Sequence, residues 1–256
     1  MTWVVRRVAA TGSTNADLLL DAAAGAPEGS VLVADHQRAG RGRLGRQWVT
    51  PPGSALAVSV LLRPPAAARD RLGWLPLLTG LAVLDALDVL APGVGAVLKW
   101  PNDVLVGAGD GVAKVAGVLV QAVPAAGAGE GAVRGVVGAV VVGIGVNVST
   151  PAAELPTGVA ATSLAAAGAD VDRDALLQVL LDRLGERYGR WVAGTDPIAD
   201  LRARCSTLGR EVAVDRPGRA LTGRAVDVDP AGRLLVRRSD GTTVAVDAGD
   251  VTHLCT

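Results

Sequence analysis

The chain has 256 residues, enough for one large domain or for a main domain with a small satellite, and 50% of them are apolar. Its 25 basic and 25 acidic residues give a formal net charge of zero, which argues against a protein that generally coats nucleic acid or a membrane surface. The two cysteines, Cys205 and Cys255, lie in no CxxC or Cys/His cluster, which excludes a zinc site and a disulfide framework.

No stretch of the sequence has the composition of a targeting or membrane-spanning segment. Arg6 and Arg7 lie where a signal peptide would need apolar residues. The two most apolar stretches, 74–91 and 136–148, are interrupted by Pro76 and by glycines respectively, and both fall short of the roughly 18–20 apolar residues that a membrane helix needs. The sequence therefore predicts a soluble, cytoplasmic protein without a membrane partner.

Up to about residue 206, apolar residues recur with the periods of strands and helices in alternation. In chain order we expect a strand at Val4–Val8, a helix at Thr14–Ala24 capped by Ser13 or Thr14 and ended by Gly25, strands at Val31–Asp35 and Ser54–Leu62, a helix at Asp70–Ala91 and a strand at Val97–Trp100. Strands at Val104–Val106, Val115–Val120 and Val136–Val148 follow, and then helices at Asp172–Val192 and Pro197–Cys205. Loops are indicated at Arg38–Pro52, Gly107–Gly111 and Ala126–Gly131.

Beyond Leu208 the sequence changes to short valine-rich runs, separated by turn residues roughly every eight to twelve positions. These runs are Glu211–Val214, Ala220–Val228, Leu234–Arg237 and Thr243–Val246. The pattern predicts a small β-barrel. We therefore divide the chain into a main domain of residues 1–206 and a barrel of residues 207–256.

Two residue types are rare in this chain. It has 23 arginines but only two lysines, Lys99 and Lys114, and its three asparagines are Asn15, Asn102 and Asn147. Lysine presents a compact point charge where arginine presents a planar fork, and asparagine offers a donor and an acceptor without charge. Chance scatter is one explanation, but the neighbourhoods GSTN, KWPND, KVAG and GVN favour a common functional site.

The segment Gly40–Trp48, GRGRLGRQW, alternates glycines with arginines after a predicted strand. Glycine lets the backbone approach a ligand closely, and arginine can bind carboxylate or phosphate through two parallel hydrogen bonds. The segment is neither a P-loop nor a GxGxxG motif. A solvated basic loop or a nucleic-acid patch is the alternative, whereas Trp48 favours a nucleotide because its ring can stack on a purine.

The motif KWPND at residues 99–103 ends a strand, and Lys114 begins the second strand of the predicted hairpin. If the hairpin forms, Lys114 lies near Asp103, and a cation beside a carboxylate could bind an anion and steer a nucleophilic amine. Gly117 would leave room for a ligand against the sheet. An ordinary strand-to-turn exit, with Asp103 as a turn former, is the alternative.

Two further motifs are weak when taken alone. Residues 12–15, GSTN, begin a predicted helix and are explained by a simple helix cap. Residues 143–147, GIGVN, end a predicted strand, where the glycines allow either a ligand or a closely packed neighbouring strand.

Taken in order, the motifs GSTN, QxxGRGRxGRxW, KWPND, KxxGxL and GxGxN, followed by a small terminal barrel, resemble those of the biotin–protein ligases. The likeness covers about residues 8–150 by motif and the remainder by architecture. It implies an α+β fold with a class-II-synthetase-like mixed sheet, flanking helices and a C-terminal SH3-like barrel. Such enzymes join biotin to ATP, with Mg²⁺, to form biotinyl-5′-AMP, and then transfer biotin to one lysine of a biotin carboxyl carrier domain.

The resemblance also implies roles for individual residues. Biotin contacts are implied for Ser13, Thr14, Asn15, Gln37, Arg41, Gly42, Arg43, Lys114 and Gly117. Nucleotide contacts are implied for Arg41, Arg43, Trp48, Asn102, Lys114 and Asn147. The implied catalytic residues are Lys99, Arg43, Lys114 and Asp103, the last orienting the acceptor lysine. No metal-ligating side chain is implied.

Some family properties are not expected here. Bifunctional members carry a DNA-binding winged helix before GSTN, and only eleven residues precede Gly12, so we expect no DNA binding. A homodimer is left open. A lipoate or octanoate transferase of the same fold is expected to carry an arginine pair followed by three glycines, whereas Val8 follows Arg6 and Arg7.

A nucleic-acid-binding module is the alternative from another class. The predicted barrel supports it with Arg233, Arg237 and Arg238. The zero net charge and the lack of aromatic platforms for base stacking argue against it, and the ligase is preferred.

Overall fold

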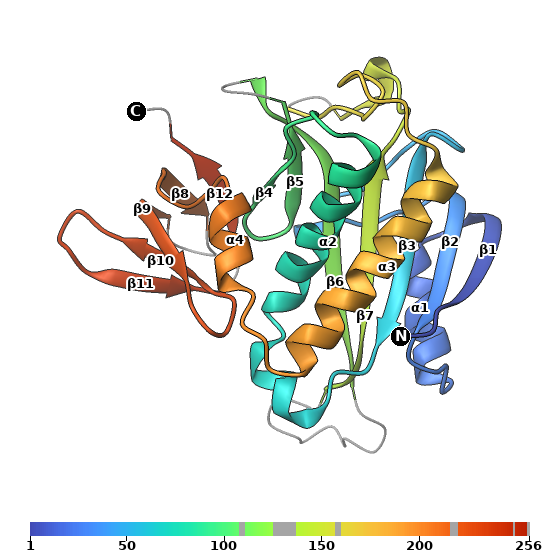
Figure 1. Ribbon diagram of the computed structural model, residues 1–256, viewed down its shortest axis with the longest axis horizontal. Coiled ribbons are helices and arrows are strands. Elements are labelled where there is room, and N and C mark those ends of the chain that lie inside the picture. Colours follow the sequence, from blue (N-terminus) through green and yellow to red (C-terminus); the bar gives the residue numbers. More distant parts are fainter. Residues whose placement is uncertain (108–110, 125–136, 157–159, 216–219, 248, 255–256) are drawn as a thin grey trace.

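The computed structural model describes residues 1–107, 111–124, 137–156, 160–215, 220–247 and 249–254. Within these ranges the chain forms a seven-stranded sheet with helices on both faces and a separate five-stranded antiparallel sheet (Figure 1). The expected α+β architecture is therefore present.

The large sheet has the strand order β1-β2-β3-β7-β6-β5-β4. Its strands are β1 (Val4–Thr11), β2 (Ser30–Gln37), β3 (Ala55–Leu62), β4 (Val97–Lys99), β5 (Asp103–Val106), β6 (Ala113–Pro124) and β7 (Val137–Asn147). Only the β1–β2 pairing is parallel, so the sheet is mixed. The predicted hairpin forms between β5 and β6, and much of its tip and the whole Ala126–Gly131 loop lie outside the described residues.

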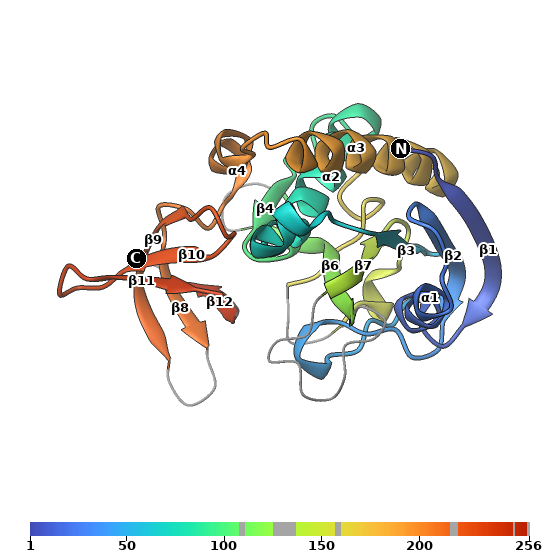
Figure 2. The same ribbon diagram turned by 90° about the horizontal axis from the view of Figure 1, so that it is seen from below.

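Two long helices pack together on one face of the large sheet, and a shorter one lies on the other face (Figure 2). The helices are α1 (Thr14–Ala23), α2 (Trp74–Leu90), α3 (Arg173–Val192) and α4 (Ile198–Arg204). Helix α2 is buried around almost its whole circumference, because it lies between the sheet and α3. No helix in the described ranges is both long and apolar enough to cross a bilayer.

The predicted start of the second helix at Asp70 is wrong. Residues Ala66–Arg71 form a 3₁₀ helix, and α2 begins at Trp74. Pro76 explains the difference, since a proline lacks the N–H that a helix interior requires but is tolerated within the first turn. A helix beginning at Asp70 would have placed Pro76 in its second turn.

The face of the large sheet that carries α1 changes character along the strands. Leu18 of α1 packs against Leu32, Leu61 and Val141, which point to this face. Alternate strand residues share a face, and further along the same strands the residues of this face become small, as at Ala57 and Gly145. These small residues leave space on this face, and at Gly145 the indole of Trp48 occupies it.

The five-stranded sheet has the order β11-β10-β9-β8-β12. Its strands are β8 (Glu211–Asp215), β9 (Leu221–Val228), β10 (Leu234–Arg237), β11 (Thr243–Val246) and β12 (Asp250–His253). Strand β12 was not predicted from the sequence. Only one of its four residues, DVTH, is apolar, and its place in the sheet comes from its pairing with β8. The indole N–H of Trp74 donates to the carbonyl of Pro230 at 3.0 Å, and that of Trp100 to the carbonyl of Gly232 at 3.3 Å, so the turn between β9 and β10 contacts the start of α2 and the residue after β4.

Candidate active site

The predicted site residues gather on the α1 face of the large sheet. One row of paired residues runs across the strands from Lys99 through Asp103, Gly117 and Gly145 to Ala57. Directly paired residues of antiparallel strands present their side chains on the same face. The lysine and the carboxylate of KWPND therefore project beside a floor of very small residues.

The structure places Lys114 against Asp103, as the hairpin predicts. The Nζ atom of Lys114 lies 2.5 Å from Oδ1 of Asp103, and the two side chains are 28% and 24% exposed. That carboxylate oxygen has no partner with hydrogen-bond geometry among the described residues, so the contact is an ion pair without a directed hydrogen bond. The backbone N–H of Lys114 donates to the carbonyl of Ala160 at 2.8 Å, which fixes the start of β6.

Lys99 lies beside the same ion pair. Burial lowers the pKa of the Lys99 ammonium, the Asp103 carboxylate opposes this shift, and the positive charge of Lys114 adds to it. Both lysines of the chain thus lie near one carboxylate, an arrangement that a negatively charged ligand would stabilise.

The segment Gly40–Trp48, called the Arg/Gly segment from here on, lies over these groups. Figure 2 shows it on the side of the sheet that carries α1. The Arg43 guanidinium donates to Oδ1 of Asn102 at 3.1 Å, and the Asn102 amide in turn donates to the carbonyl of Val118 at 2.8 Å. Arg46 forms an ion pair of 2.7 Å with Asp250 of β12. The segment therefore contacts both KWPND and the small sheet.

Charge and exposure differ among the arginines of the segment. Burial lowers the pKa of the Arg43 guanidinium, and the carboxylates of Asp250 and Asp103 oppose the shift. Arg41 is exposed, and Gly42 is half-buried with its N–H donating to the carbonyl of Arg46 at 2.7 Å. Of these residues, only Arg43 reaches the KWPND motif directly.

Trp48 lies at the centre of the cluster. Its indole packs against the backbone of β6 and β7 at Gly117 and Gly145. The Nζ atom of Lys114 lies 5.7 Å from the ring centroid, within the range of a cation–π interaction. The aromatic ring of the Arg/Gly segment and the lysine of β6 are thus in contact.

A second polar network lies where α1 begins. Ser13 is the N-cap of α1, and both the backbone N–H and the hydroxyl of Thr14 donate to Oε1 of Gln37, at 2.8 and 3.0 Å. The Asn15 amide donates to the carbonyl of Leu119 at 3.2 Å and to Oε1 of Gln121 at 2.9 Å. The four predicted residues of this region therefore lie together.

Ser59 joins the two halves of this network, and the sequence analysis missed it. Its hydroxyl is fully buried and lies 2.7 Å from Oγ1 of Thr14 and 2.6 Å from Oδ1 of Asn15. A lone hydroxyl in the otherwise apolar strand ALAVSVLL was the available signal. Gln121 was missed as well, and nothing in its local sequence marks it.

Asn147 lies at the end of β7 and contacts Thr162, which also contacts Lys114. The residue is 4% exposed, and its side-chain amide donates to the carbonyl of Thr162 at 3.0 Å. The N–H of Thr162 donates to the carbonyl of Lys114 at 2.9 Å. Residue 162 therefore connects the GxGxN and KxxGxL motifs.

The small sheet reaches KWPND through a second contact, which the sequence analysis also missed. The hydroxyl of Thr207 accepts from the backbone N–H of Trp100 at 3.0 Å and lies 3.1 Å from Nε2 of His253. Burial, followed by the charges of Lys99 and Arg210, lowers the pKa of His253 to about 4. His253 is therefore neutral at pH 7 and can accept the Thr207 hydrogen.

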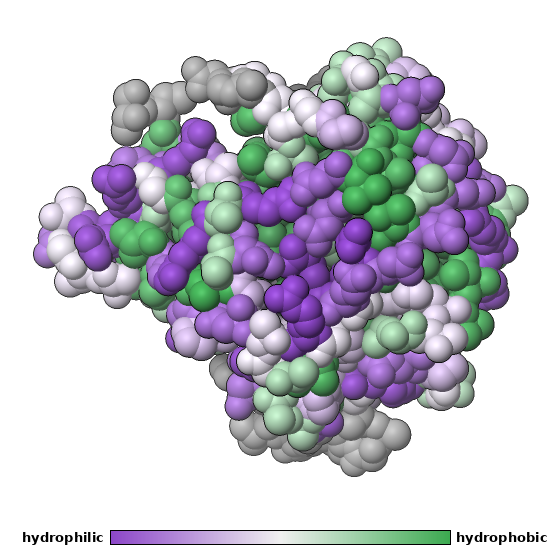
Figure 3. Space-filling view, viewed as in Figure 1, coloured by the Kyte–Doolittle hydropathy of each residue, from purple (hydrophilic) through white to green (hydrophobic). Residues whose placement is uncertain are grey.

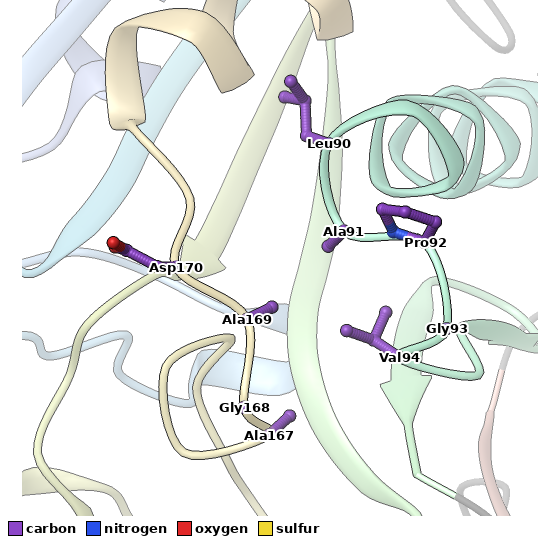
Figure 4. A pocket seen from close by; sticks show the side chains of 9 residues that line it. All are labelled: Leu90, Ala91, Pro92, Gly93, Val94, Ala167, Gly168, Ala169 and Asp170. Atoms are coloured by element: carbon purple, nitrogen blue, oxygen red, sulfur yellow. The ribbon is translucent and has the colours of Figure 1, made fainter.

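Two surface cavities lie away from this cluster. One of about 340 Å³ lies between the end of α2 and residues 167–170, and the side chains that line it are apolar apart from Asp170 (Figure 4). The other, of about 390 Å³, lies beside β1 and α1. Figure 3 shows an apolar area within a largely hydrophilic face near the upper ends of α2 and α3. Neither cavity is lined by any of the convergent polar groups of the site.

Comparison with known proteins decides the family. Residues 8–147 match the model of the Biotin/lipoate A/B protein ligase family, which is more than half of the chain. The chain belongs to this family. Residues 207–254 match the Biotin protein ligase C terminal domain, and the expected SH3-like fold of this region is confirmed.

Other members of the biotin/lipoate protein ligase family resemble the chain along most of its length. It is 42% identical over 253 residues to a biotin–[acetyl-CoA-carboxylase] ligase of Mycobacterium tuberculosis, covering 96% of this chain and 88% of that protein. A protein of the same name from Paracoccus denitrificans is 36% identical, with 85% of each chain covered. The solved structure of the biotin protein ligase from Aquifex aeolicus in complex with biotin and ATP superposes with a TM-score of 0.79 at 28% identity, covering 98% of this chain and 99% of that chain.

Proposed function

We propose that the chain is an ATP-dependent biotin–protein ligase, which forms biotinyl-5′-AMP from biotin and ATP and transfers biotin to one lysine of a biotin carboxyl carrier domain. The names of the relatives support this proposal, as does the solved structure with biotin and ATP. The observation that carries it is the Lys114–Asp103 ion pair, which lies under Trp48 and beside Arg43.

The network at the start of α1 suits the ureido group of biotin. This group has two N–H donors and one carbonyl acceptor, and the protein offers hydroxyl and amide groups that can pair with both kinds. We assign Ser13, Thr14, Asn15 and Gln37 to the ureido side of biotin. We assign Arg41, Gly42, Arg43, Lys114 and Gly117 to the rest of the ligand.

The cations suit the phosphates and the biotin carboxylate. Lys99, Lys114, Arg43 and Arg46 outnumber the nearby carboxylates Asp103 and Asp250, so the cluster has an excess of positive charge. Charge-assisted hydrogen bonds to carboxylate or phosphate are stronger than neutral ones. We assign the nucleotide to Arg41, Arg43, Trp48, Asn102, Lys114 and Asn147.

The reaction has two steps in this proposal. The biotin carboxylate attacks the α-phosphorus of ATP and displaces pyrophosphate, while the cations stabilise the negative charge on the transferring group. The acceptor amine then attacks the acyl carbon, loses a proton and displaces AMP. Asp103 orients this amine, and Lys99, Lys114 and Arg43 hold the phosphate.

Mg²⁺ enters with ATP in this proposal. The described residues contain no group of three His, Cys, Asp or Glu side chains that could enclose a metal ion. Magnesium in proteins commonly binds through substrate phosphates, waters and one or two carboxylates. Asp103 is a carboxylate beside the proposed phosphate position, so the residues present fit an ion delivered by the nucleotide.

Other properties stay predictions of the sequence. They are the division into a catalytic domain of residues 1–206 and a barrel of residues 207–256, the cytoplasmic location and the absence of DNA binding, while a homodimer is left open. The acceptor would be a carrier domain of a biotin-dependent carboxylase, as the names of the relatives suggest. The same names favour biotin over lipoate, although the matched family includes ligases for both.

Incubation of the chain with biotin, Mg²⁺·ATP and a biotin carboxyl carrier domain tests the proposal. We expect the acceptor to gain the mass of one biotinyl group, and we expect no gain after its target lysine is replaced by arginine. Lipoate in place of biotin is the matched control. A lipoyl adduct without a biotinyl adduct would support the lipoate alternative, and no adduct with either acid would refute the ligase.

A further inference from the structure

We propose that Gly145 is the positioning residue for Trp48: its missing side chain lets the indole lie directly on the sheet at the place where the nucleotide base is bound. This inference rests on the proposed function. From the sequence alone, a closely packed neighbouring strand is one explanation for this glycine.

The space above Gly145 is filled by the indole. A Cβ atom built on Gly145 would lie 2.5 Å from Cε2 of Trp48, 2.7 Å from Cζ2 and 2.8 Å from Nε1. These distances are below those that real Cβ atoms show, and the indole is a rigid ring that has to move as a unit. An alanine at position 145 would therefore displace the whole ring of Trp48.

The backbone of Gly145 does not itself require glycine. Its φ is not positive, and the residue pairs regularly with Ala57 on one side and Gly117 on the other. Glycine in a strand interior weakens the strand because it has no side chain to pack. The reason for glycine here is the space that Trp48 occupies.

No polar contact fixes the indole. Its Nε1 is buried and has no hydrogen-bond partner among the described residues, and Lys114 contacts the ring only through a cation–π interaction. At Gly117 an added Cβ would lie 3.4 Å from Cζ3 of Trp48, which is an ordinary contact. The shape of the floor at Gly145 therefore determines where the ring lies.

Gly143 provides a matched control on the same strand. It lies two residues before Gly145, hence on the same face, and its φ is not positive. An added Cβ at Gly143 would collide with the side-chain amide of Asn15 instead of Trp48. Alanine at position 145 would therefore perturb the proposed nucleotide end of the site, and alanine at position 143 the proposed biotin end.

The test compares Gly145→Ala with Gly143→Ala by pyrophosphate release, with ATP and biotin varied in turn. Stacking of a base on an aromatic side chain changes affinity by about five- to a hundredfold. We expect Gly145→Ala to raise the KM for ATP within this range and to leave the KM for biotin within about twofold. We expect the reverse for Gly143→Ala. Equal changes in both KM values for Gly145→Ala would overturn the proposal.

A double-mutant cycle with Trp48→Ala separates the positioning role from a weakened strand. Without the indole, a methyl group at position 145 has nothing to displace, so Gly145→Ala should change the KM for ATP by less than about twofold in that background. If Gly145→Ala prevents folding, Trp48→Ala should restore it. The same loss in both backgrounds would show that the indole is not the cause, and would refute the proposal.

A fluorine label reports on the indole without any activity. In the chain labelled with 5-fluorotryptophan, the ¹⁹F resonance that Trp48→Ala removes belongs to Trp48. We expect this resonance to shift in Gly145→Ala and to stay in Gly143→Ala, and an unshifted resonance in Gly145→Ala would overturn the proposal. A wild-type chain that releases no pyrophosphate would instead refute the proposed function, while this readout would still test the positioning of the ring.

Discussion

Replacing Ser59 with alanine would remove the hydrogen-bond donor that faces Asn15. Both amide hydrogens of Asn15 are used by Leu119 and Gln121, and the hydroxyl hydrogen of Thr14 is used by Gln37. The hydroxyl of Ser59 therefore donates to the remaining acceptor, the buried Oδ1 of Asn15, at 2.6 Å. Its removal leaves the acceptor unpaired.

A buried acceptor without a partner costs about 1–3 kcal/mol. We expect Ser59→Ala to lower the free energy of unfolding by about this amount. Because the Asn15 amide is then no longer fixed, we also expect the KM for biotin to rise about tenfold, which corresponds to about 1.4 kcal/mol. The KM for ATP should change little, since the nucleotide residues lie outside this network.

Urea unfolding and pyrophosphate release at varied biotin measure the two effects. Ser54→Ala is the matched control, because Ser54 is also buried and its hydroxyl donates to the carbonyl of Pro51 at 2.9 Å, outside the network at the start of α1. The control should lose about 1 kcal/mol of stability without a change in the KM for biotin. If Ser59→Ala loses stability but keeps its KM for biotin, the hydroxyl has only a structural role and the reasoning is wrong.

Three further predictions concern the cations and the Arg/Gly segment. Lys114→Arg should reduce pyrophosphate release by about a hundredfold, because a planar fork cannot replace a point charge in the half-buried contact with Asp103; unchanged release would contradict this. Arg43→Gly should still form biotinyl-AMP but lose it about ten- to a hundredfold faster, since a charge-assisted contact is worth about 1.5–3 kcal/mol. Streptavidin blotting of albumin should then detect bystander labelling, and an unlabelled blot with no biotinyl-AMP in the supernatant would rule out retention by Arg43. Hydrogen exchange over residues 38–48 should slow when biotin and ATP bind, because ligand contacts would order the segment, and equal exchange with and without ligands would refute that ordering.

The sequence by itself determined the elements whose signal is local. Helix α1 begins at the N-cap Ser13, as GSTN indicates, and the β5–β6 hairpin brings Lys114 to Asp103, as its short connection requires. Even the error in the predicted start of α2 has a local reason, because Pro76 is tolerated only in the first turn of a helix. In these cases the residues that interact are near one another in the chain.

Only the tertiary structure decided which distant residues complete the site. Arg46 and Asp250 form their ion pair across 204 positions of sequence, and Asn15 meets Ser59 across 44. Hydrophobic periodicity reports whether a residue faces the core, but it carries no information about which residue lies opposite on a neighbouring strand. That information comes from the strand order and register, and these place Gly145 beneath Trp48 and β12 beside the Arg/Gly segment.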